Sequence, residues 1–272
     1  MRQEPDVDLA RAATPSGLKT LEGLYVQYPT DRRLLTLLSE ATCQFGAGFL
    51  QDDWERATVA GQRARAERAR WRARGMFARC IEYALKLLPG AWRAALWSRS
   101  DKLAALIARA GTRHVPGMLF TALGLAATIG MFPEDFAVGA RISQVEMLLE
   151  RAIALDEGYA DGLAHMTLGI LHSARSAAVG GDPARGKRHL ERARALTGGR
   201  SLMVDVLLAR YYAVTVRDHA LFRAALVRVL QTDPAVWPEG RLANELAQRK
   251  ARLYLRHERL WFDRPGPSAA AQ

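Results

Sequence analysis

Apolar residues recur every three or four positions through most of the chain, and this period predicts helices. Two neighbouring segments, 162–172 and 183–196, illustrate the pattern, because small and large apolar residues share one face of each. Faces of this kind pack closely, so we expect the two segments to form an antiparallel helix pair. The sequence therefore predicts an all-α fold of stacked antiparallel helix pairs.

The clearest of these helices carries a start signal and a stop signal. Asp182 can cap a helix N-terminus, and Pro183 suits the first helical position. Gly198 and Gly199 can form the left-handed turn that ends a helix. Between these signals the apolar face alternates small and large residues at Gly186, Leu190, Ala193 and Leu196.

The pattern of helix pairs with small residues at the crossing is typical of tetratricopeptide repeats. Segments 201–216 and 218–231 repeat the pattern loosely. Ala193 and Val229 hold equivalent places 36 residues apart, near the period of about 34 in a tetratricopeptide unit. We therefore predict a degenerate tetratricopeptide-like superhelix.

The two ends of the chain differ from its middle. Residues 1–15 are polar and mixed in charge, which predicts a flexible arm, and Ser16 is a possible N-cap for the first helix. The Pro, Gly, Ser and Ala residues of 263–272 predict a disordered tail. Because 272 residues with 49% apolar content can bury a large core, we expect a single helical domain over 16–262.

The formal charge of +11 is due mostly to arginine. An excess of basic over acidic residues often indicates a nucleic-acid partner. However, these arginines are spread among alanines along almost every predicted helix, which is typical of solvated faces. The densest run, 63–74, has only Glu67 to offset its arginines. We interpret this run as a solvated helix face, with an anionic partner surface as the alternative, and we expect no nucleic-acid partner.

The stretch 115–133 contains no charged residue, as a membrane span would. Pro116 and several glycines and alanines make it too weakly apolar for confident insertion. We expect a buried central helix or one that faces an apolar cavity. Phe120 and Leu123 are the candidates for lining a pore, and packing in the core is the alternative.

The cysteines and the N-terminus say little about the compartment. Cys43 and Cys80 could pair only if their helices adjoin, and two buried free thiols are the favoured interpretation. Met1 leads into polar residues without the apolar segment of a signal peptide. A cytosolic protein and a protein whose leader has been removed both fit this start.

The sequence contains none of the common catalytic motifs, such as HExxH, GxSxG or a phosphate-binding glycine loop. His165 and His172 lie two helical turns apart, but no acidic ligand has matching spacing. They are interpreted as histidines of the core or of a ligand groove. We therefore expect no enzyme activity, no metal and no cofactor.

Two polar pairs are the better candidates for ligand or pore contacts. Tyr211 and Tyr212 are adjacent aromatic residues with hydroxyl groups. Asn244 and Gln248 are four positions apart, so their amides lie on one helix face. Because buried amides need hydrogen-bond partners, the alternative for this pair is a contact between helices.

Four segments carry a family resemblance: MLLERAIALDEGYADGLAHMTLGILHS, VGGDPARGKRHLERARAL, ARYYAVTVRD and RLANELAQRKARLYL. The most specific parts are Gly180, Gly181, Asp182 and Pro183 (GGDP), the HLERA that follows from His189 to Ala193, and LAN followed by LAQ, which contain Asn244 and Gln248. From about residue 34 to 255 the chain resembles the T-component family of periplasmic TRAP transporters.

The resemblance implies a periplasmic, tetratricopeptide-like protein without catalysis that binds the solute-binding P subunit. It also implies a homo-oligomer, with a trimer favoured, around a pore that passes a small hydrophobic or anionic ligand. The family is typically made as membrane-anchored lipoproteins, so the resemblance implies a leader that is absent from this chain. The alternative function is a general tetratricopeptide scaffold that binds a peptide or protein in its concave groove.

Overall fold

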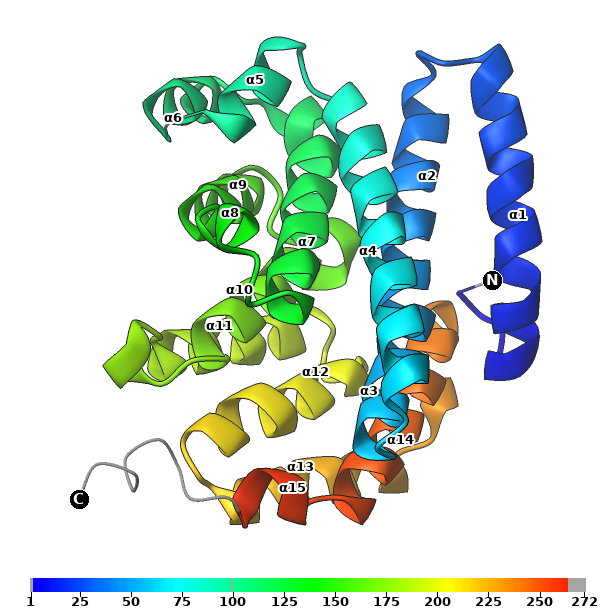
Figure 1. The fold of residues 1–272 in the computed structure, drawn as a ribbon, viewed down its shortest axis with the longest axis vertical. Coiled ribbons are helices and arrows are strands. Elements are labelled where there is room, and N and C mark those ends of the chain that lie inside the picture. The colour runs from blue at the N-terminus through cyan, green and yellow to red at the C-terminus, as the bar shows by residue number, and fades with distance from the viewer. Residues whose placement is uncertain (1, 99, 264–272) are drawn as a thin grey trace. The chain divides into compact units, whose positions relative to one another are not determined.

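A computed structural model describes residues 2–98 and 100–263 of the chain. These residues form helices and no strand, so the predicted all-α fold class is confirmed (Figure 1). Their contacts group into an N-terminal unit, Asp8–Thr167, and a C-terminal unit, Leu168–Gln272 with Met1–Val7. The tetratricopeptide-like superhelix and the single domain stay predictions. Apart from Asp263, the predicted disordered tail lies outside the described residues.

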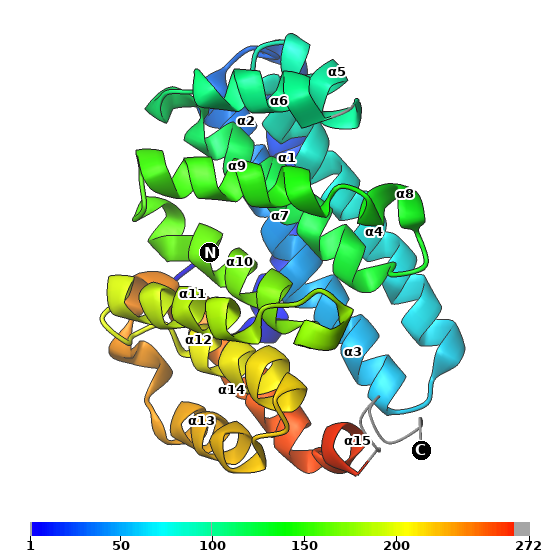
Figure 2. The same ribbon diagram turned by 90° about the vertical axis from the view of Figure 1, so that its left-hand side faces the viewer.

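The N-terminal unit is built around α4, which packs against α2, α3 and α7. In Figures 1 and 2, α4 and α7 lie side by side. The helices of this unit are α1 (Val7–Gln27), α2 (Arg32–Phe45), the π-helix η1 (Gly46–Leu50), α3 (Gln51–Val59), α4 (Arg63–Lys86), α5 (Ala91–Trp97), α6 (Ser100–Ala108), the 3₁₀-helix η2 (Thr112–His114), α7 (Val115–Met131), α8 (Phe136–Gly139), α9 (Ile142–Leu155) and η3 (Tyr159–Gly162).

Glycines on α7 set its distance from α4. A Cβ atom on Gly117 would lie 2.7 Å from the Leu88 side chain and 3.0 Å from the Ala84 carbonyl oxygen. A Cβ atom on Gly124 would lie 2.7 Å from Ile81 Cγ1. Cβ atoms are essentially never found at such distances from other atoms. The backbones of α4 and α7 can approach this closely because both positions lack a Cβ atom.

The first helix begins earlier than the polar N-terminal sequence predicts. Helix α1 starts at Val7 and includes Pro15, so residues 7–15 are helical and not a flexible arm, and Ser16 is not an N-cap. One face of this segment, with Ala10 and Thr14, is buried. Arg11 also forms an ion pair with Asp53 of α3. Burial and this ion pair hold the segment in place despite its polar composition.

The two cysteines form a disulfide bond between α2 and α4, and the prediction of two buried free thiols is wrong. The Cα atoms of Cys43 and Cys80 are 5.3 Å apart, because α2 and α4 are packing neighbours. Periodicity alone does not show which helices adjoin, so it could not favour this pairing. Disulfides persist in oxidising compartments such as the bacterial periplasm and are rare in the cytosol.

The charge-free stretch forms a core helix. Thr112–Met131 is long and apolar enough to cross a membrane by length and composition, with a mean hydropathy of 1.4 in its most apolar window. However, 67% of that window is buried inside the protein. Core helices of soluble proteins share these properties, and the expectation of a buried central helix is confirmed.

The C-terminal unit is also built from packed helices. Helix α10 (Leu163–Ser173) crosses the boundary between the two units. The rest are η4 (Ala177–Val179), α11 (Pro183–Leu196), α12 (Leu202–Leu207), the π-helix η5 (Leu208–Ala213), α13 (His219–Gln231), η6 (Pro234–Val236), η7 (Pro238–Gly240), α14 (Arg241–Arg256) and α15 (Arg259–Phe262). Helices α12, α13 and α14 lie side by side (Figure 2), and the core between them includes Phe222 and Ala247.

Helix α11 has the start and stop signals that the sequence predicts. The Asp182 carboxylate accepts the backbone N–H of Arg185 at 2.9 Å, and Pro183 occupies the first position. Gly198 and Gly199 adopt φ angles of 58° and 71° after the helix ends. A Cβ atom on Gly186 would lie 2.8 Å from the Gly169 carbonyl oxygen of α10. The predicted close contact between these two helices is therefore confirmed.

Replacing Gly124 with alanine should lower the free energy of unfolding by about 1–3 kcal/mol, because the added methyl group overpacks the α4–α7 contact. Gly130 lies in the same helix, and a Cβ atom added there would meet no other atom within 4 Å. Gly130→Ala is therefore the matched control and should raise stability by up to about 1 kcal/mol. Urea unfolding followed by circular dichroism measures both. Equal effects of the two substitutions would contradict the packing account.

Reducing the disulfide should lower the free energy of unfolding by about 2–4 kcal/mol, because the bond restricts the unfolded chain between two cysteines that are 37 positions apart. Urea unfolding of the native chain with and without dithiothreitol measures this difference. The variant Cys43→Ala/Cys80→Ala is the control and should not respond to the reductant. Two thiols titrated in the unfolded, unreduced protein would show that the bond does not form.

Candidate functional site

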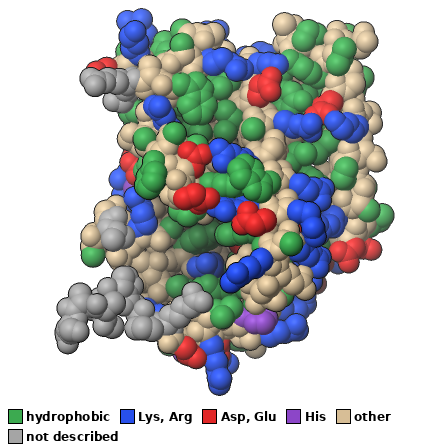
Figure 3. Space-filling model, in the orientation of Figure 1, with side chains coloured by type: hydrophobic (Ala, Val, Ile, Leu, Met, Phe, Trp, Pro, Cys, Tyr) green, Lys and Arg blue, Asp and Glu red, His purple; other side chains and the backbone are tan. Residues whose placement is uncertain are grey.

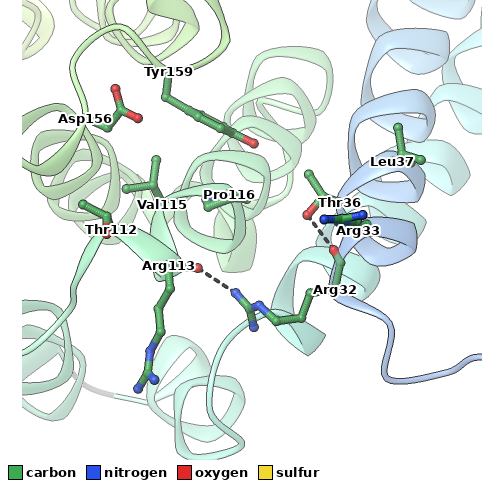
Figure 4. Close-up of a pocket in the computed structure, with 10 residues that line it drawn as sticks. All are labelled: Arg32, Arg33, Thr36, Leu37, Thr112, Arg113, Val115, Pro116, Asp156 and Tyr159. Atoms are coloured by element: carbon green, nitrogen blue, oxygen red, sulfur yellow. Dashed lines mark hydrogen bonds between the residues drawn. The ribbon is translucent and has the colours of Figure 1, made fainter.

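An open pocket of about 530 Å³ lies in the N-terminal unit. Figure 4 shows Asp156 and Tyr159 on one side of it and the α2 residues on the other. The lining comes from α2, η2, the start of α7 and the segment after α9, and consists of Arg32, Arg33, Thr36, Leu37, Thr112, Arg113, Val115, Pro116, Asp156 and Tyr159.

The first turn of α2 supplies two arginines to the pocket. Asp31 caps the helix by accepting the Leu34 N–H at 2.9 Å, so the helix starts with Arg32 and Arg33. The buried stripe of α2 faces away from the solvent, which leaves Arg33 and Leu37 exposed one turn apart. Cations at a helix N-terminus lie against the positive end of the helix dipole, so helix stability does not explain this pair of arginines.

The two α2 arginines differ in their contacts. Arg32 donates hydrogen bonds to the Leu87 carbonyl oxygen at 2.9 Å and to the Arg113 carbonyl oxygen at 2.6 Å. It therefore ties α2 to the end of α4 and to η2. No ion pair or hydrogen bond within the described part of the chain holds the Arg33 guanidinium. Arg33 is thus available to a ligand, while Arg32 positions the wall.

The opposite wall depends on an unusual turn. Ala160, Asp161 and Gly162 adopt positive φ angles of 52°, 60° and 74° in succession. The left-handed region is costly for alanine and aspartate, and such strain persists only where the surroundings fix it. The side chains of Glu157 and His165, 3.1 Å apart, bridge the two ends of this turn. The turn places Tyr159 in the pocket wall.

Tyr159 joins the pocket to the core of the unit. Its ring packs against the buried cluster that contains Cys43, Cys80, Ala84 and Phe120. Burial, together with the negative charges of Glu40 and Asp156, raises the pKa of Tyr159 above its ordinary value of 10.0. Its hydroxyl group therefore stays protonated near neutral pH and can donate a hydrogen bond.

The pocket combines positive charge with apolar surface. Arg32, Arg33 and Arg113 all line the pocket, with Asp156 as the single acidic residue. The Arg32 guanidinium is held by two carbonyl oxygens and the Arg113 side chain points away from the pocket in Figure 4, so Arg33 supplies the available positive charge. Leu37, Val115 and Pro116 provide apolar contacts in the same lining. This arrangement suits a small molecule with an anionic group and an apolar body. Within residues 2–98 and 100–263 no group of three or more His, Cys, Asp or Glu residues could hold a metal ion.

A sequence profile described as TRAP transporter T-component matches residues 3–262. The chain belongs to this family. It is also 25% identical over 272 residues to a protein of Treponema pallidum (strain Nichols) described as an uncharacterized protein, with 96% of this chain and 81% of that protein covered. The match confirms the resemblance in the sequence. The T-component family is associated with a periplasmic transporter and is a transport component.

In this T-component, three of the predicted site residues lie in the N-terminal unit but do not line the pocket. Phe120 is only 1% exposed and belongs to the core cluster around the disulfide. Leu123 is partly buried against the same cluster. His165 is buried beside Glu157 at the turn that carries Tyr159. Phe120 therefore occupies the core, which was the alternative to pore lining.

The remaining aromatic candidates lie in the C-terminal unit. His172 is buried and stacks on His189, with ring centroids 5.9 Å apart. Tyr211 and Tyr212 lie in the π-helix η5 and are partly exposed. The Lys187 ammonium group lies 5.5 Å from the Tyr212 ring centroid. π-Helices are rare in proteins, and those that occur often lie at functional sites. Tyr211 and Tyr212 therefore remain candidates for a ligand or pore contact.

Asn244 and Gln248 hold neighbouring elements of the C-terminal unit together. Asn244 Oδ1 accepts the Leu202 N–H at 2.9 Å, and its Nδ2 donates to the carbonyl oxygens of Arg200 and Pro234. Gln248 Nε2 donates to the carbonyl oxygens of Val229 and Thr232. The N–H groups of both amides donate to backbone carbonyl oxygens inside the protein, which supports the alternative of a contact between helices.

Proposed function

We propose that this chain is the non-enzymatic T-component of a TRAP transporter, which binds the periplasmic solute-binding P subunit and passes a small ligand. The family match across residues 3–262 carries the proposal. The disulfide supports a periplasmic location, because such bonds persist in oxidising compartments. Lipoprotein anchoring and assembly into a homo-oligomer, a trimer, around a pore belong to the same proposal.

The pocket between α2 and η3 is the proposed ligand site within this function. A ligand carboxylate or phosphate would pair with Arg33, and its apolar part would lie on Leu37 and Pro116. Tyr159 would donate a hydrogen bond from its protonated hydroxyl group. We place the ligand path here and not at Phe120, because the Phe120 side chain is enclosed by its own chain.

The chain should co-purify with the solute-binding P subunit encoded beside it, and the isolated chain should have the mass of a homo-oligomer. Pull-down with a tagged chain measures the first property, and light scattering after size exclusion measures the second. A monomer that ignores the P subunit would contradict the transporter proposal. Selective binding of an unrelated peptide in its place would favour the tetratricopeptide scaffold.

Arg33→Glu should weaken binding of octanoate about 10- to 100-fold, because a charge-assisted hydrogen bond contributes about 1.5–3 kcal/mol and the new carboxylate repels the ligand. Isothermal titration calorimetry with octanoate, butyrate and octanol separates the anionic and apolar contributions. We expect octanoate to bind more tightly than either of the other probes.

Arg93→Glu is the matched control for this experiment. Arg93 lies exposed on α5 and is not part of the pocket lining, so the same charge reversal should leave octanoate binding within about twofold. Equal losses in the two variants would show that net charge, and not the pocket, attracts the probe. Absence of octanoate binding to the native chain would remove the proposed ligand class.

A further inference from the structure

The densest arginine run of the sequence forms one exposed face of α4. Arg65, Arg68 and Arg72 are three and four positions apart, so they share one side of the helix, and all three are exposed. Figure 3 shows Lys and Arg side chains gathered over α4. Within the described residues no carboxylate pairs with Arg68 or Arg72, and Arg65 contacts Gln62 at 3.3 Å. The face is therefore positively charged and open to solvent.

Trp71 lies exposed beside this arginine face, and Phe136 lies exposed at the start of α8. Trp71 is 58% exposed and Phe136, at the start of α8, is 85% exposed. The Trp71 ring packs on Phe132, with centroids 5.2 Å apart, and the Arg74 guanidinium lies 5.3 Å from the Trp71 ring centroid. Trp71 is thus held at the edge of the arginine face with more than half of its surface in water.

The loop that precedes Phe136 is fixed against α4 by two other arginines. Arg70 donates to the Met131 carbonyl oxygen at 2.8 Å and forms an ion pair with Glu134. Arg74 Nη2 lies 2.7 Å from Asp135 Oδ2. These contacts engage the acidic residues next to the face, so they do not neutralise Arg65, Arg68 or Arg72. Arg74 contacts both Asp135, which precedes Phe136, and the ring of Trp71.

We propose that this surface, which comprises Arg65, Arg68, Trp71, Arg72 and Phe136, docks on the anionic phospholipid headgroups of a membrane. Guanidinium groups match phosphate in geometry, and their stems cover apolar surface while the charge stays at the headgroups. Tryptophan is the residue most typical of the zone between water and lipid, where one part of its ring is apolar and the N–H is hydrated.

The compartment favours a membrane over the other polyanions that such a surface could bind. The disulfide and the family's association with a periplasmic transporter place the chain where nucleic acid is not a partner. A row of exposed arginines on one helix face suits headgroups that move laterally to meet the charges, and exposed aromatic groups can enter the lipid surface. The proposal does not depend on binding of the P subunit or on the ligand pocket.

The full chain should bind vesicles of phosphatidylethanolamine with phosphatidylglycerol and should not bind phosphatidylcholine vesicles. The variant Arg65→Gln/Arg68→Gln/Arg72→Gln should lower the partition coefficient about a hundredfold, which corresponds to about fivefold for each basic residue near an anionic surface. Co-sedimentation across a range of lipid concentrations measures the coefficient. The control variant, with the same change in net charge from exposed arginines of α5, α11 and the end of α6, is Arg93→Gln/Arg109→Gln/Arg188→Gln.

The contribution of Phe136 and Trp71 to vesicle binding can be measured separately. Phe136→Ser changes a side chain that lies almost wholly in solvent and should lower the partition coefficient about tenfold. Phosphatidylglycerol vesicles should shift the tryptophan emission to shorter wavelength, and Trp71→Phe should remove that shift.

Two results would overturn the proposal. One is an equal loss of vesicle binding in the two triple variants, which would show attraction by net charge only. The other is full vesicle binding by Phe136→Ser together with equally strong, arginine-dependent binding of a soluble DNA duplex. That second result would identify a general polyanion surface and not a membrane surface.

Discussion

The close approach of α7 to α4 is the constraint on which the N-terminal unit depends. It requires glycine at positions 117 and 124, because any side chain there would enter the space of Leu88 or Ile81. Helix α4 also holds α2, through the disulfide and through direct packing. Helix α2 and the start of α7 form two walls of the pocket. The distances from α4 to α2 and from α4 to α7 therefore set the width of the pocket.

Helix α4 presents three different surfaces around its axis. Its buried side, with Ala73, Phe77 and Cys80, makes the core. A second side carries Arg70 and Arg74, which hold the loop before α8. The third side is the exposed arginine face. The alanines between the arginines matter here, because they allow tight packing on one side of a helix whose other side is strongly charged.

The sequence predicted the fold class and the ends of α11, because these depend on local signals such as Asp182, Pro183 and Gly198. It could not predict the disulfide, because pairing depends on which distant helices adjoin. It also missed the start of α1, where a polar segment is held by an ion pair to Asp53 and by a buried face. Local composition carries no information about either contact.

The candidate site was less accessible to sequence reasoning than the fold. Phe120 and Asn244 were predicted as ligand or pore residues from their residue types alone. In the structure both are buried, and they serve packing and contacts between helices. The pocket instead brings together residues of α2 and of the turn after α9, more than a hundred positions apart. One local signal existed: two arginines directly after the cap Asp31, where the helix dipole disfavours cations.

The left-handed turn at Ala160, Asp161 and Gly162 makes one wall of the pocket much less tolerant of substitution than the wall that faces it. Branched residues cannot occupy that backbone conformation, and an inserted residue would rotate Tyr159 out of the wall. The facing positions Arg33 and Leu37 lie on the solvent side of a regular helix and accept almost any side chain. Substitutions on α2 can therefore alter the proposed ligand site without disturbing the backbone, while the turn fixes the position of Tyr159.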